Sequence, residues 1–372
     1  MIWVFGVSLA ALIYIYAGYP IAIWLEARRK PVDHPESHVL CPLPDIAIVL
    51  PVYNDAARLA RKLRNLKQLD YPANIRIVVV SDGSTDGTTD VALSTRGVET
   101  VVLTTRRGKP AALNAGMHRV HEEIVVFMDV RQQVDVLALR ALARHFADPT
   151  IGAVSGLLVH LRPNSAEAAS IGLYWRYERW IRLSESRFLS SVGATGALYA
   201  IRRKLWQDLP VDTLIDDFVT PMRVVRQGYR VMLDPTAVIY DELQTRVAGE
   251  FTRKVRTLMG NYQAMLHEPW LFAAENPLRF QWLSHKVARL LAPYFLLALL
   301  VSSYFLPGPW FRAIFWVQAV AYGIGLAGQL VPALGRFRIV GFLTTFLALK
   351  AATIVSLWRF LRSPAEVRWE KT

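Results

Sequence analysis

The stretch IRIVVVSDGSTDGT, residues 75–88, decides how the chain folds. Its run of β-branched apolar residues is typical of a buried strand, and the small and acidic residues after it are typical of a tight turn. Two carboxylates, Asp82 and Asp86, lie in that turn, although the net charge of the chain is +13. This placement indicates a polar crevice where the strand ends.

Strand-like and helix-like segments alternate around this stretch. Short β-rich runs cover residues 45–54, 75–84, 98–105 and 122–130. The segments between them have apolar residues at helical spacing. This order predicts a mostly parallel sheet with helices on both faces. Ligands of such sheets bind at the carboxyl ends of the strands. Since Asn54, Asp82 and Asp129 each follow a strand, we expect them to converge on one crevice.

Four runs with almost no charge are long enough to cross a bilayer as helices: residues 2–25, 287–306, 310–334 and 339–357. Basic residues follow the first run instead of preceding it, which argues against a cleaved signal peptide. The positive-inside rule places Met1 outside and the region from Arg28 in the cytoplasm. Four spans would place the C-terminal end outside as well, and the rule disfavours Arg359 and Arg362 on that side. For any single run, the alternative is a buried core helix.

The composition narrows the function classes. A hydrophobic content of 53% favours a membrane protein, and the single cysteine, Cys41, excludes an internal disulfide framework and a multi-cysteine metal site. The positive charge predicts an acidic partner, such as a phosphorylated substrate, anionic lipid or nucleic acid. Nucleic acid ranks last because the basic residues flank the apolar runs and the strand ends, and no base-stacking module is evident.

Two segments mix aromatic with basic residues, as helices in the headgroup layer of a membrane do. They cover residues 166–188 and 270–285. They predict an active site held against the membrane, and ordinary core packing of the aromatic residues is the alternative.

Four motifs occur in a specific order: PVYN (51–54), VSDGSTDGT (80–88), GKPAALNAG (108–116) and FMD (127–129). Together they resemble the donor half of the inverting glycosyltransferase family 2 over about residues 45–260. The flanking apolar runs are similar to those of membrane-integrated polysaccharide synthases that make cellulose, chitin or hyaluronan. The resemblance implies an α/β fold, with a Rossmann-like GT-A cytoplasmic domain between N-terminal and C-terminal transmembrane helices.

The expected organisation has six parts. These are a transmembrane helix (1–27), a linker (28–44), the GT-A glycosyltransferase domain (45–265), an interfacial helix (266–286), three transmembrane helices (287–362) and a tail (363–372).

The resemblance implies a set of residues that bind the nucleotide-sugar donor. Tyr53, Asn54 and Asp82 would hold the nucleoside, and Lys109 would lie near the diphosphate.

The strand that ends in FMD carries a departure from the family. Most members have a DxD motif that binds a divalent cation, whereas this chain has Asp129, Val130 and Arg131. Asp129 can still hold Mg²⁺ or Mn²⁺ through oxygen, and Arg131 can neutralise the diphosphate directly. We therefore expect metal dependence that is reduced but retained.

The second half of the domain is expected to bind the acceptor. GATGALYAIRRKLW, residues 193–206, resembles the acceptor segment of the family and implies contacts from Gly193, Thr195 and Gly196, with a tight turn as the alternative. The resemblance implies that Asp216 lies on the acceptor side and that Asp217 is the general base. Acids also favour helix starts, so a purely structural pair is the alternative.

FTRKVRTLMGNYQAM, residues 251–265, occupies the place of the QxxRW motif of processive synthases. Arg256 matches the arginine and implies a contact to the donor diphosphate. Arg253 and Thr257 replace the glutamine and the tryptophan. Because that tryptophan helps to form the acceptor platform, its replacement favours the addition of one or a few sugars.

The sequence therefore predicts a membrane-bound inverting glycosyltransferase of cell-surface or exopolysaccharide synthesis. It would move a sugar from a UDP- or GDP-sugar to a growing polysaccharide or a polyprenyl-linked oligosaccharide. We expect a multi-pass protein of the plasma (inner) membrane with a cytoplasmic catalytic domain, possible membrane partner subunits and no nucleic acid. The alternative is a catalytically silent, nucleotide-binding membrane partner of a glycan synthesis complex, which the missing second aspartate of DxD motivates.

Overall fold

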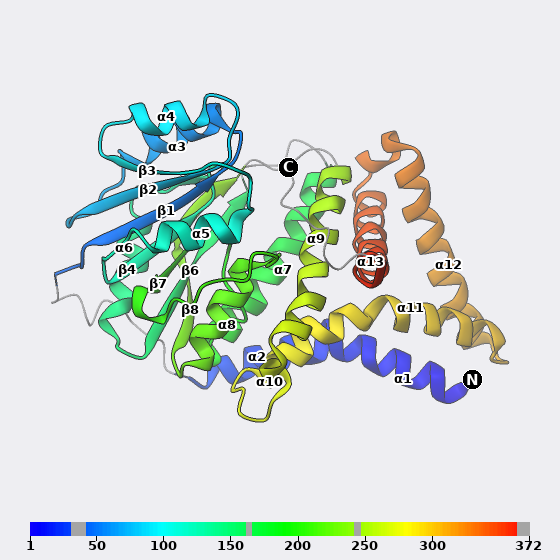
Figure 1. The fold of residues 1–372 in the computed structure, drawn as a ribbon. Coiled ribbons are helices and arrows are strands. Elements are labelled where there is room, and N and C mark those ends of the chain that lie inside the picture. The colour runs from blue at the N-terminus through cyan, green and yellow to red at the C-terminus, as the bar shows by residue number, and fades with distance from the viewer. Residues whose placement is uncertain (31–41, 161–165, 242–246, 363–372) are drawn as a thin grey trace.

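The computed structural model describes residues 1–30, 42–160, 166–241 and 247–362. A domain built on one twisted sheet lies beside a group of long helices formed by the two ends of the chain (Figure 1). Most of the predicted linker (28–44) and all of the predicted tail (363–372) lie outside the described residues.

The sheet has eight strands in the order β3-β2-β1-β4-β7-β6-β8-β5. Their bounds are β1 Ile46–Val52, β2 Ile75–Asp82, β3 Val98–Leu103, β4 Ile124–Met128, β5 Gln133–Val134, β6 Ile151–His160, β7 Leu198–Arg202 and β8 Arg230–Asp241. The first four strands are parallel, as predicted. The long pair β6 and β8 is parallel as well, so the prediction of a mostly parallel sheet is confirmed. The exceptions are β7, which is antiparallel to β4 and β6, and β5, which is antiparallel to β8.

The reversal of β7 has a simple cause. Its first residue, Leu198, pairs with Met128, the last residue of β4. The strand thus starts at the carboxyl edge of the sheet, where β4 ends, and has to run the opposite way. The turn before β7 is thereby placed at that edge, next to Asp129, whose backbone N–H donates to the carbonyl of Ala197 (3.4 Å).

The helices of the central domain are α3 Ala56–Leu66, α4 Thr88–Ser94, α5 Lys109–Met117, α6 Ala138–Ala143, α7 Ala166–Phe188, α8 Asp216–Arg226 and α9 Val247–His267. Two apolar cores flank the sheet, because alternate residues of a strand point to opposite faces. On β1, Ile48 packs with Leu59 of α3 on one face, and Val49 packs with Leu113 of α5 on the other, all of them fully buried. This double burial explains the continuous apolar runs of the parallel strands.

The ends of the chain form α1 Ile2–Ile13, α2 Tyr19–Arg28, α10 Arg279–Gln281, α11 Ala288–Phe305, α12 Pro309–Leu330 and α13 Arg338–Arg362. Short π-helical segments join α1 to α2 (Tyr14–Gly18) and α10 to α11 (Trp282–Val287).

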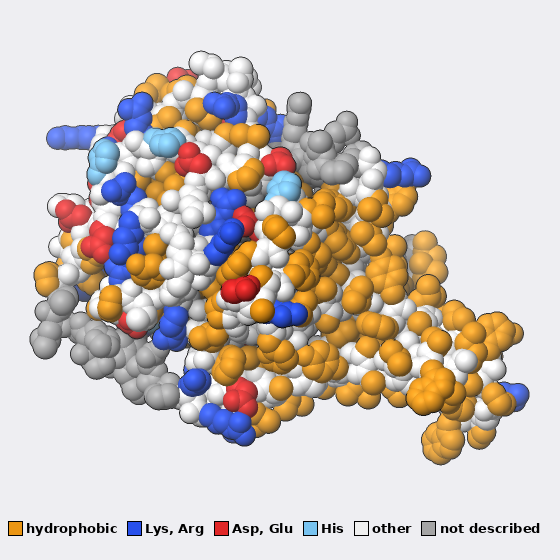
Figure 2. All heavy atoms as spheres, turned by 60° about the horizontal axis from the view of Figure 1, so that its bottom comes forward, with side chains coloured by type: hydrophobic (Ala, Val, Ile, Leu, Met, Phe, Trp, Pro, Cys, Tyr) orange, Lys and Arg blue, Asp and Glu red, His pale blue; other side chains and the backbone are white. Residues whose placement is uncertain are grey.

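Four helices are long and apolar enough to cross a membrane, one for each predicted run: Ile2–Arg28, Arg279–Phe305, Pro309–Leu330 and Arg338–Arg362. Figure 2 shows a broad apolar surface over this part of the molecule, whereas charged side chains gather on the sheet domain. Helix α13 packs against both α7 and α9. The apolar helices therefore contact the same helices that cover the carboxyl edge of the sheet.

Candidate functional site

A cavity of about 720 Å³ lies at the carboxyl edge of the sheet, between the strand ends and helices α7, α8 and α9. Most of the predicted site residues line it: Tyr53, Lys109, Asp129, Arg131, Thr195, Gly196, Asp216, Asp217 and Arg256. Three others, Asn54, Asp82 and Gly193, are not among its lining residues. Each of these three supports a loop that carries a lining residue.

Asp82 holds the loop that leads to Lys109. Its carboxylate is fully buried and accepts hydrogen bonds from the backbone N–H groups of Arg107 (2.7 Å) and Gly108 (2.8 Å). The next residue, Gly83, has φ +65°, and a Cβ there would lie 2.3 Å from the backbone nitrogen of Arg106. The close approach of two backbones explains why a glycine follows the aspartate in this turn.

Asn54 ties the turn after β1 to the turn after β2. It has φ 47°, and its side-chain oxygen accepts a hydrogen bond from the backbone N–H of Thr85 (2.7 Å). Its neighbour Tyr53 lines the cavity, with the guanidinium of Arg106 4.2 Å from the centre of its ring. An aromatic face at a strand end, backed by a cation, suits the stacking of a flat ring.

Lys109 joins the first half of the domain to the second. Its ammonium lies 3.0 Å from Asp129 Oδ1 and 3.3 Å from Asp216 Oδ1. Burial alone would lower the pKa of Lys109, but the charges of Asp129, Asp216 and Asp217 raise it. The lysine is therefore a permanent cation among three carboxylates.

Asp217 is the carboxylate best suited to accept a proton. It lies in the first turn of α8, and burial together with the charge of Asp216 raises its pKa to about 6, against the opposing charge of Lys109. A carboxylate with a pKa near that value is ionised at neutral pH and remains a useful base. The acidic pair thus differs from an ordinary helix cap, because Asp217 lines the cavity and has a shifted pKa.

The turn before β7 packs against Asp217, the expected base. Gly193 has φ +92°, and the backbone N–H of Ala194 donates to the carbonyl of Asp217 (2.7 Å). The N–H of Thr195 donates to Ser155 Oγ (2.8 Å). At Gly196, a Cβ would lie 2.7 Å from Asp217 Oδ2. The small residues of the turn therefore leave room for the base.

We expect Gly196→Ala to lower the rate of glycosyl transfer by about 10²-fold, because the added methyl group displaces the Asp217 carboxylate. Steady-state kinetics with a saturating donor would measure the effect. Gly323→Ala is the matched control, since a Cβ at Gly323 meets nothing within 4 Å. Equal activity of the two variants would show that the position of Asp217 is not critical.

The residues at the end of β4 fit a divalent cation held by one protein carboxylate. Asp129 lines the cavity with its side chain 37% exposed, and Lys109 contacts its Oδ1. Mg²⁺ in nucleotide sites commonly takes one or two carboxylates and completes its shell with substrate phosphates and water. Within the described ranges, no cluster of three or more His, Cys, Asp or Glu side chains has metal-binding geometry.

Arg131 pairs with Asp241, the last residue of β8, whose side chain is buried. The side-chain amide of Gln132 also donates to Asp241 Oδ2 (3.3 Å). Asp241 therefore anchors the segment after Asp129, a role that sequence reasoning missed. No motif marks Asp241, and it lies 110 positions from Arg131.

Lys62 is a second group that sequence reasoning missed. Its side chain is only 2% exposed, and its ammonium donates to the carbonyl of Gln132 (2.9 Å). Burial lowers the pKa of Lys62 to about 7, with the charge of Asp129 acting against this. A buried amine thus lies beneath the loop that carries Asp129 and Arg131. In α3, Lys62 lies three residues after Leu59 and four before Leu66, on the same buried helix face, and this spacing is a weak signal of its burial.

Residues 47–209 match the family model "Glycosyl transferase family 2". The chain is 23% identical over 239 residues to the poly-beta-1,6-N-acetyl-D-glucosamine synthase of Staphylococcus aureus, covering 61% of this chain and 57% of the relative. It is 25% identical over 254 residues to the beta-monoglucosyldiacylglycerol synthase of Synechocystis sp., covering 64% and 52%. The matches thus span little more than half the length of these relatives.

The same fold occurs in a solved structure, the mannosyltransferase PcManGT from Pyrobaculum calidifontis in complex with GDP-Man and Mn²⁺. The TM-score is 0.71 at 24% identity, and the alignment covers 96% of this chain and 99% of that chain. The alternating strands, the cavity at their carboxyl ends and these matches agree. The domain has the GT-A fold, and residues 47–209 are similar to glycosyl transferase family 2, in agreement with the four motifs.

Proposed function

We propose that the protein is a membrane-bound inverting glycosyltransferase that uses a nucleotide sugar to extend a polysaccharide or a polyprenyl-linked oligosaccharide. The observation that carries the proposal is the position of Asp217, a carboxylate with a raised pKa beside Lys109 in one cavity. The relatives include a poly-beta-1,6-N-acetyl-D-glucosamine synthase, which supports a role in polysaccharide synthesis.

In the proposed reaction, the nucleoside of a UDP- or GDP-sugar lies against Tyr53, and the diphosphate lies near Lys109 and Arg256. Asp217 removes the proton of an acceptor hydroxyl as its oxygen attacks the anomeric carbon. The new glycosidic bond forms while the bond from that carbon to the diphosphate oxygen breaks, which inverts the configuration. Lys109 stabilises the negative charge of the departing nucleoside diphosphate.

We propose that Asp129 holds a Mg²⁺ or Mn²⁺ ion together with the donor diphosphate. When bound, this ion would neutralise part of the charge of the leaving group. The Mn²⁺ in the structurally similar mannosyltransferase supports the assignment. Because Arg131 replaces the second acid of DxD, this chain contributes one carboxylate fewer than most family members.

An excess of chelator is expected to lower kcat/KM by at least about tenfold but to leave measurable transfer, because Lys109 and Arg256 remain as cations near the diphosphate. Added Mg²⁺ or Mn²⁺ should restore the rate. In Asp129→Asn, the metal should no longer stimulate. Full activity in chelator would show that transfer does not require a metal ion.

We place the protein in the plasma (inner) membrane, with the four apolar helices as spans and the catalytic domain in the cytoplasm. The length and hydropathy of these helices support membrane insertion. The basic residues after the first helix favour the cytoplasmic side for the domain. Membrane partner subunits of a larger synthase complex are compatible with this arrangement.

The test uses the full-length protein in lipid with a panel of UDP- and GDP-sugars and Mg²⁺ or Mn²⁺. Product mass is measured by mass spectrometry. Turnover of one donor is the expected result, and a single added sugar or a short ladder would agree with Thr257 at the position of the motif tryptophan. A long ladder would indicate a processive synthase. Absence of transfer and of donor hydrolysis across the panel would favour a catalytically silent nucleotide-binding partner.

A further inference from the structure

The cavity extends beyond Asp217 into a strongly basic groove between α7 and α9. Six cations from these two helices line it: Arg176, Arg179, Arg182, Arg253, Lys254 and Arg256. We call this set the basic groove. Among the lining residues that the described parts of α7 and α9 contribute, Glu178 is the single acid. On the α7 side, three arginines face this one acid, so that side of the groove carries an excess of positive charge.

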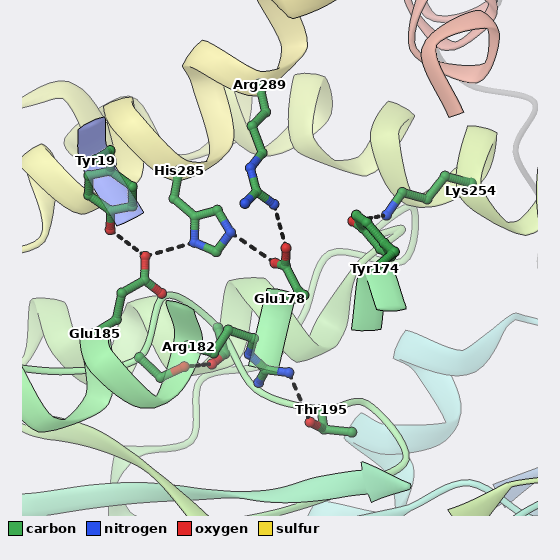
Figure 3. A network of polar contacts seen from close by, with 11 residues as sticks. Tyr19, Tyr174, Glu178, Arg182, Glu185, Thr195, Lys254, His285 and Arg289 are labelled. Atoms are coloured by element: carbon green, nitrogen blue, oxygen red, sulfur yellow. Dashed lines mark hydrogen bonds and ion pairs between the residues drawn. The ribbon is translucent and has the colours of Figure 1, made fainter. Parts of the chain in front are cut away.

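Glu178 does not offset that excess, because cations outside the groove already neutralise it. His285 Nε2 lies 2.8 Å from Glu178 Oε1, and Arg289 contacts the other oxygen (Figure 3). Burial alone would raise the pKa of Glu178, but the charges of Arg289 and His285 hold it well below its usual range. The second ring nitrogen of His285 bonds Glu185 Oε1 (2.7 Å), which also accepts from the Tyr19 hydroxyl. This network belongs to the junction of α7 with the apolar helices.

The donor side of the cavity has no comparable excess of charge. Arg58 pairs with Asp55 (3.1 Å), Lys109 with Asp129 (3.0 Å) and Arg131 with Asp241. All of these residues line the cavity. A nucleoside diphosphate at this side would meet Lys109 and Arg256, so the cations of α7 are left for a different anion.

The groove connects the base with the apolar helices. Arg182 donates to Thr195 Oγ1 (3.2 Å), in the turn that packs on Asp217, and it is within electrostatic range of Asp217. At the other end, α7 and α9 pack against α13, whose length and hydropathy suit a membrane span. A molecule in the groove could thus present a hydroxyl to Asp217 and an apolar tail to the apolar helices.

A neutral glycan would not satisfy this groove. Sugar hydroxyls are compensated by neutral donors and acceptors, and the neighbouring arginines of α7 repel one another unless an anion lies among them. Arginine is the side chain best matched to phosphate, because its planar guanidinium donates two parallel hydrogen bonds. The composition of the groove therefore favours a ligand that carries phosphate.

We propose that the α7 arginines of the basic groove bind a phosphate or diphosphate group of the acceptor, so that the acceptor is a phosphate-linked saccharide whose lipid portion lies along the apolar helices. This assignment rests on the proposed function, since it names the acceptor class of the same reaction. The phosphate linkage stays intact, and a sugar hydroxyl of the acceptor gives its proton to Asp217.

The experiment compares acceptors that differ in the linkage alone. The full-length protein in phosphatidylcholine nanodiscs receives a donor that it hydrolyses and one N-acetylglucosamine disaccharide in three forms. The disaccharide is attached to a short polyprenyl chain through a diphosphate, attached to the same chain through an uncharged ether, or carried as a soluble glycosyl phosphate. Each kcat/KM is divided by the donor hydrolysis rate of the same preparation.

The variant Arg176→Gln/Arg179→Gln removes two exposed cations of the groove, and Arg61→Gln/Arg64→Gln removes two exposed arginines of α3 that do not line the cavity. We expect wild type to prefer the diphosphate over the ether by at least about tenfold, and the groove variant to lose about tenfold or more of that preference. The α3 control should keep it. If the soluble glycosyl phosphate performs as well as the lipid form, phosphate recognition holds and its source is a soluble acceptor.

Equal use of the diphosphate and ether acceptors by wild type would overturn the inference. So would an equal loss on both acceptors in the groove variant, or donor hydrolysis without transfer to either phosphate-bearing acceptor. These results leave the proposed nucleotide-sugar chemistry intact. Absence of any donor turnover would contradict the proposed function itself.

Discussion

Replacing Asp217 by asparagine is expected to lower the rate of glycosyl transfer by about 10³-fold or more, because the amide cannot accept the proton of the attacking hydroxyl. The change keeps the size of the side chain and its place in the first turn of α8. Donor affinity should therefore stay within a few fold of wild type. Rapid-quench kinetics would measure transfer, and calorimetry would measure donor binding.

Asp90→Asn is the matched control, since Asp90 is an exposed acid in the first turn of α4 and does not line the cavity. Near-normal transfer by Asp217→Asn would show that another group accepts the proton. A loss of both transfer and donor binding would point to a structural role for Asp217 instead.

The charges around Asp217 are expected to set the pH dependence of the transfer rate. In wild type, kcat should fall below about pH 6, because Asp217 becomes protonated there. Lys109→Met removes the cation that lowers the pKa of Asp217, so the acid limb of the pH profile should move to higher pH by roughly one unit. Because Lys109 also faces the donor diphosphate, kcat/KM should drop by about 10²-fold or more.

Asp216→Asn should move the same limb in the opposite direction, because the charge of Asp216 raises the pKa of Asp217. Lys67→Met, at the exposed end of α3, is the control for loss of a lysine. The pH dependence of kcat under saturating donor and acceptor separates these effects from binding. Identical limbs in wild type and both site variants would exclude Asp217 as the titrating group.

The parallel half of the fold could be predicted because local pattern and tertiary structure agree there. Strands β1, β2 and β4 are buried on both faces, so each appears as a continuous apolar run that ends in turn residues. The antiparallel direction of β7 could not be predicted, because it depends on the edge of the sheet at which the chain arrives after α7. The direction of a strand leaves no periodic signal in the sequence.

The sequence predicted which loops meet at the site, but it did not predict the hydrogen bonds and ion pairs between their residues. Asp82 is predicted to bind the nucleoside, and nothing in the sequence indicated that its carboxylate also accepts hydrogen bonds from the backbone of Arg107 and Gly108. The pairing of Arg131 with Asp241 joins residues 110 positions apart. Side-chain direction and long-range pairing arise from packing, which a single sequence does not encode position by position. The burial of Lys62 was missed for the same reason, because a lysine in a helix is normally read as exposed.

The basic groove shows how one sequence pattern can support two interpretations. The arginines of 166–188 were expected at the headgroup layer of a membrane, and Arg256 of 251–265 was expected at the donor diphosphate. The structure shows that Arg179 and Arg182 of α7 and Arg253 of α9 also line the cavity. Helical spacing predicts that such residues lie on one face of the helix. It does not predict that this face lines the cavity, because that depends on how the helices pack on the sheet.

The proposed reaction is a single inverting displacement in which Asp217 acts as the base. The anomeric configuration of the first product, determined by NMR with an α-linked nucleotide-sugar donor, tests it most directly. We expect a β-linked product from wild type and no product of either configuration from Asp217→Asn within the same reaction time. An α-linked product would contradict it, because retention requires a different arrangement of nucleophile and leaving group.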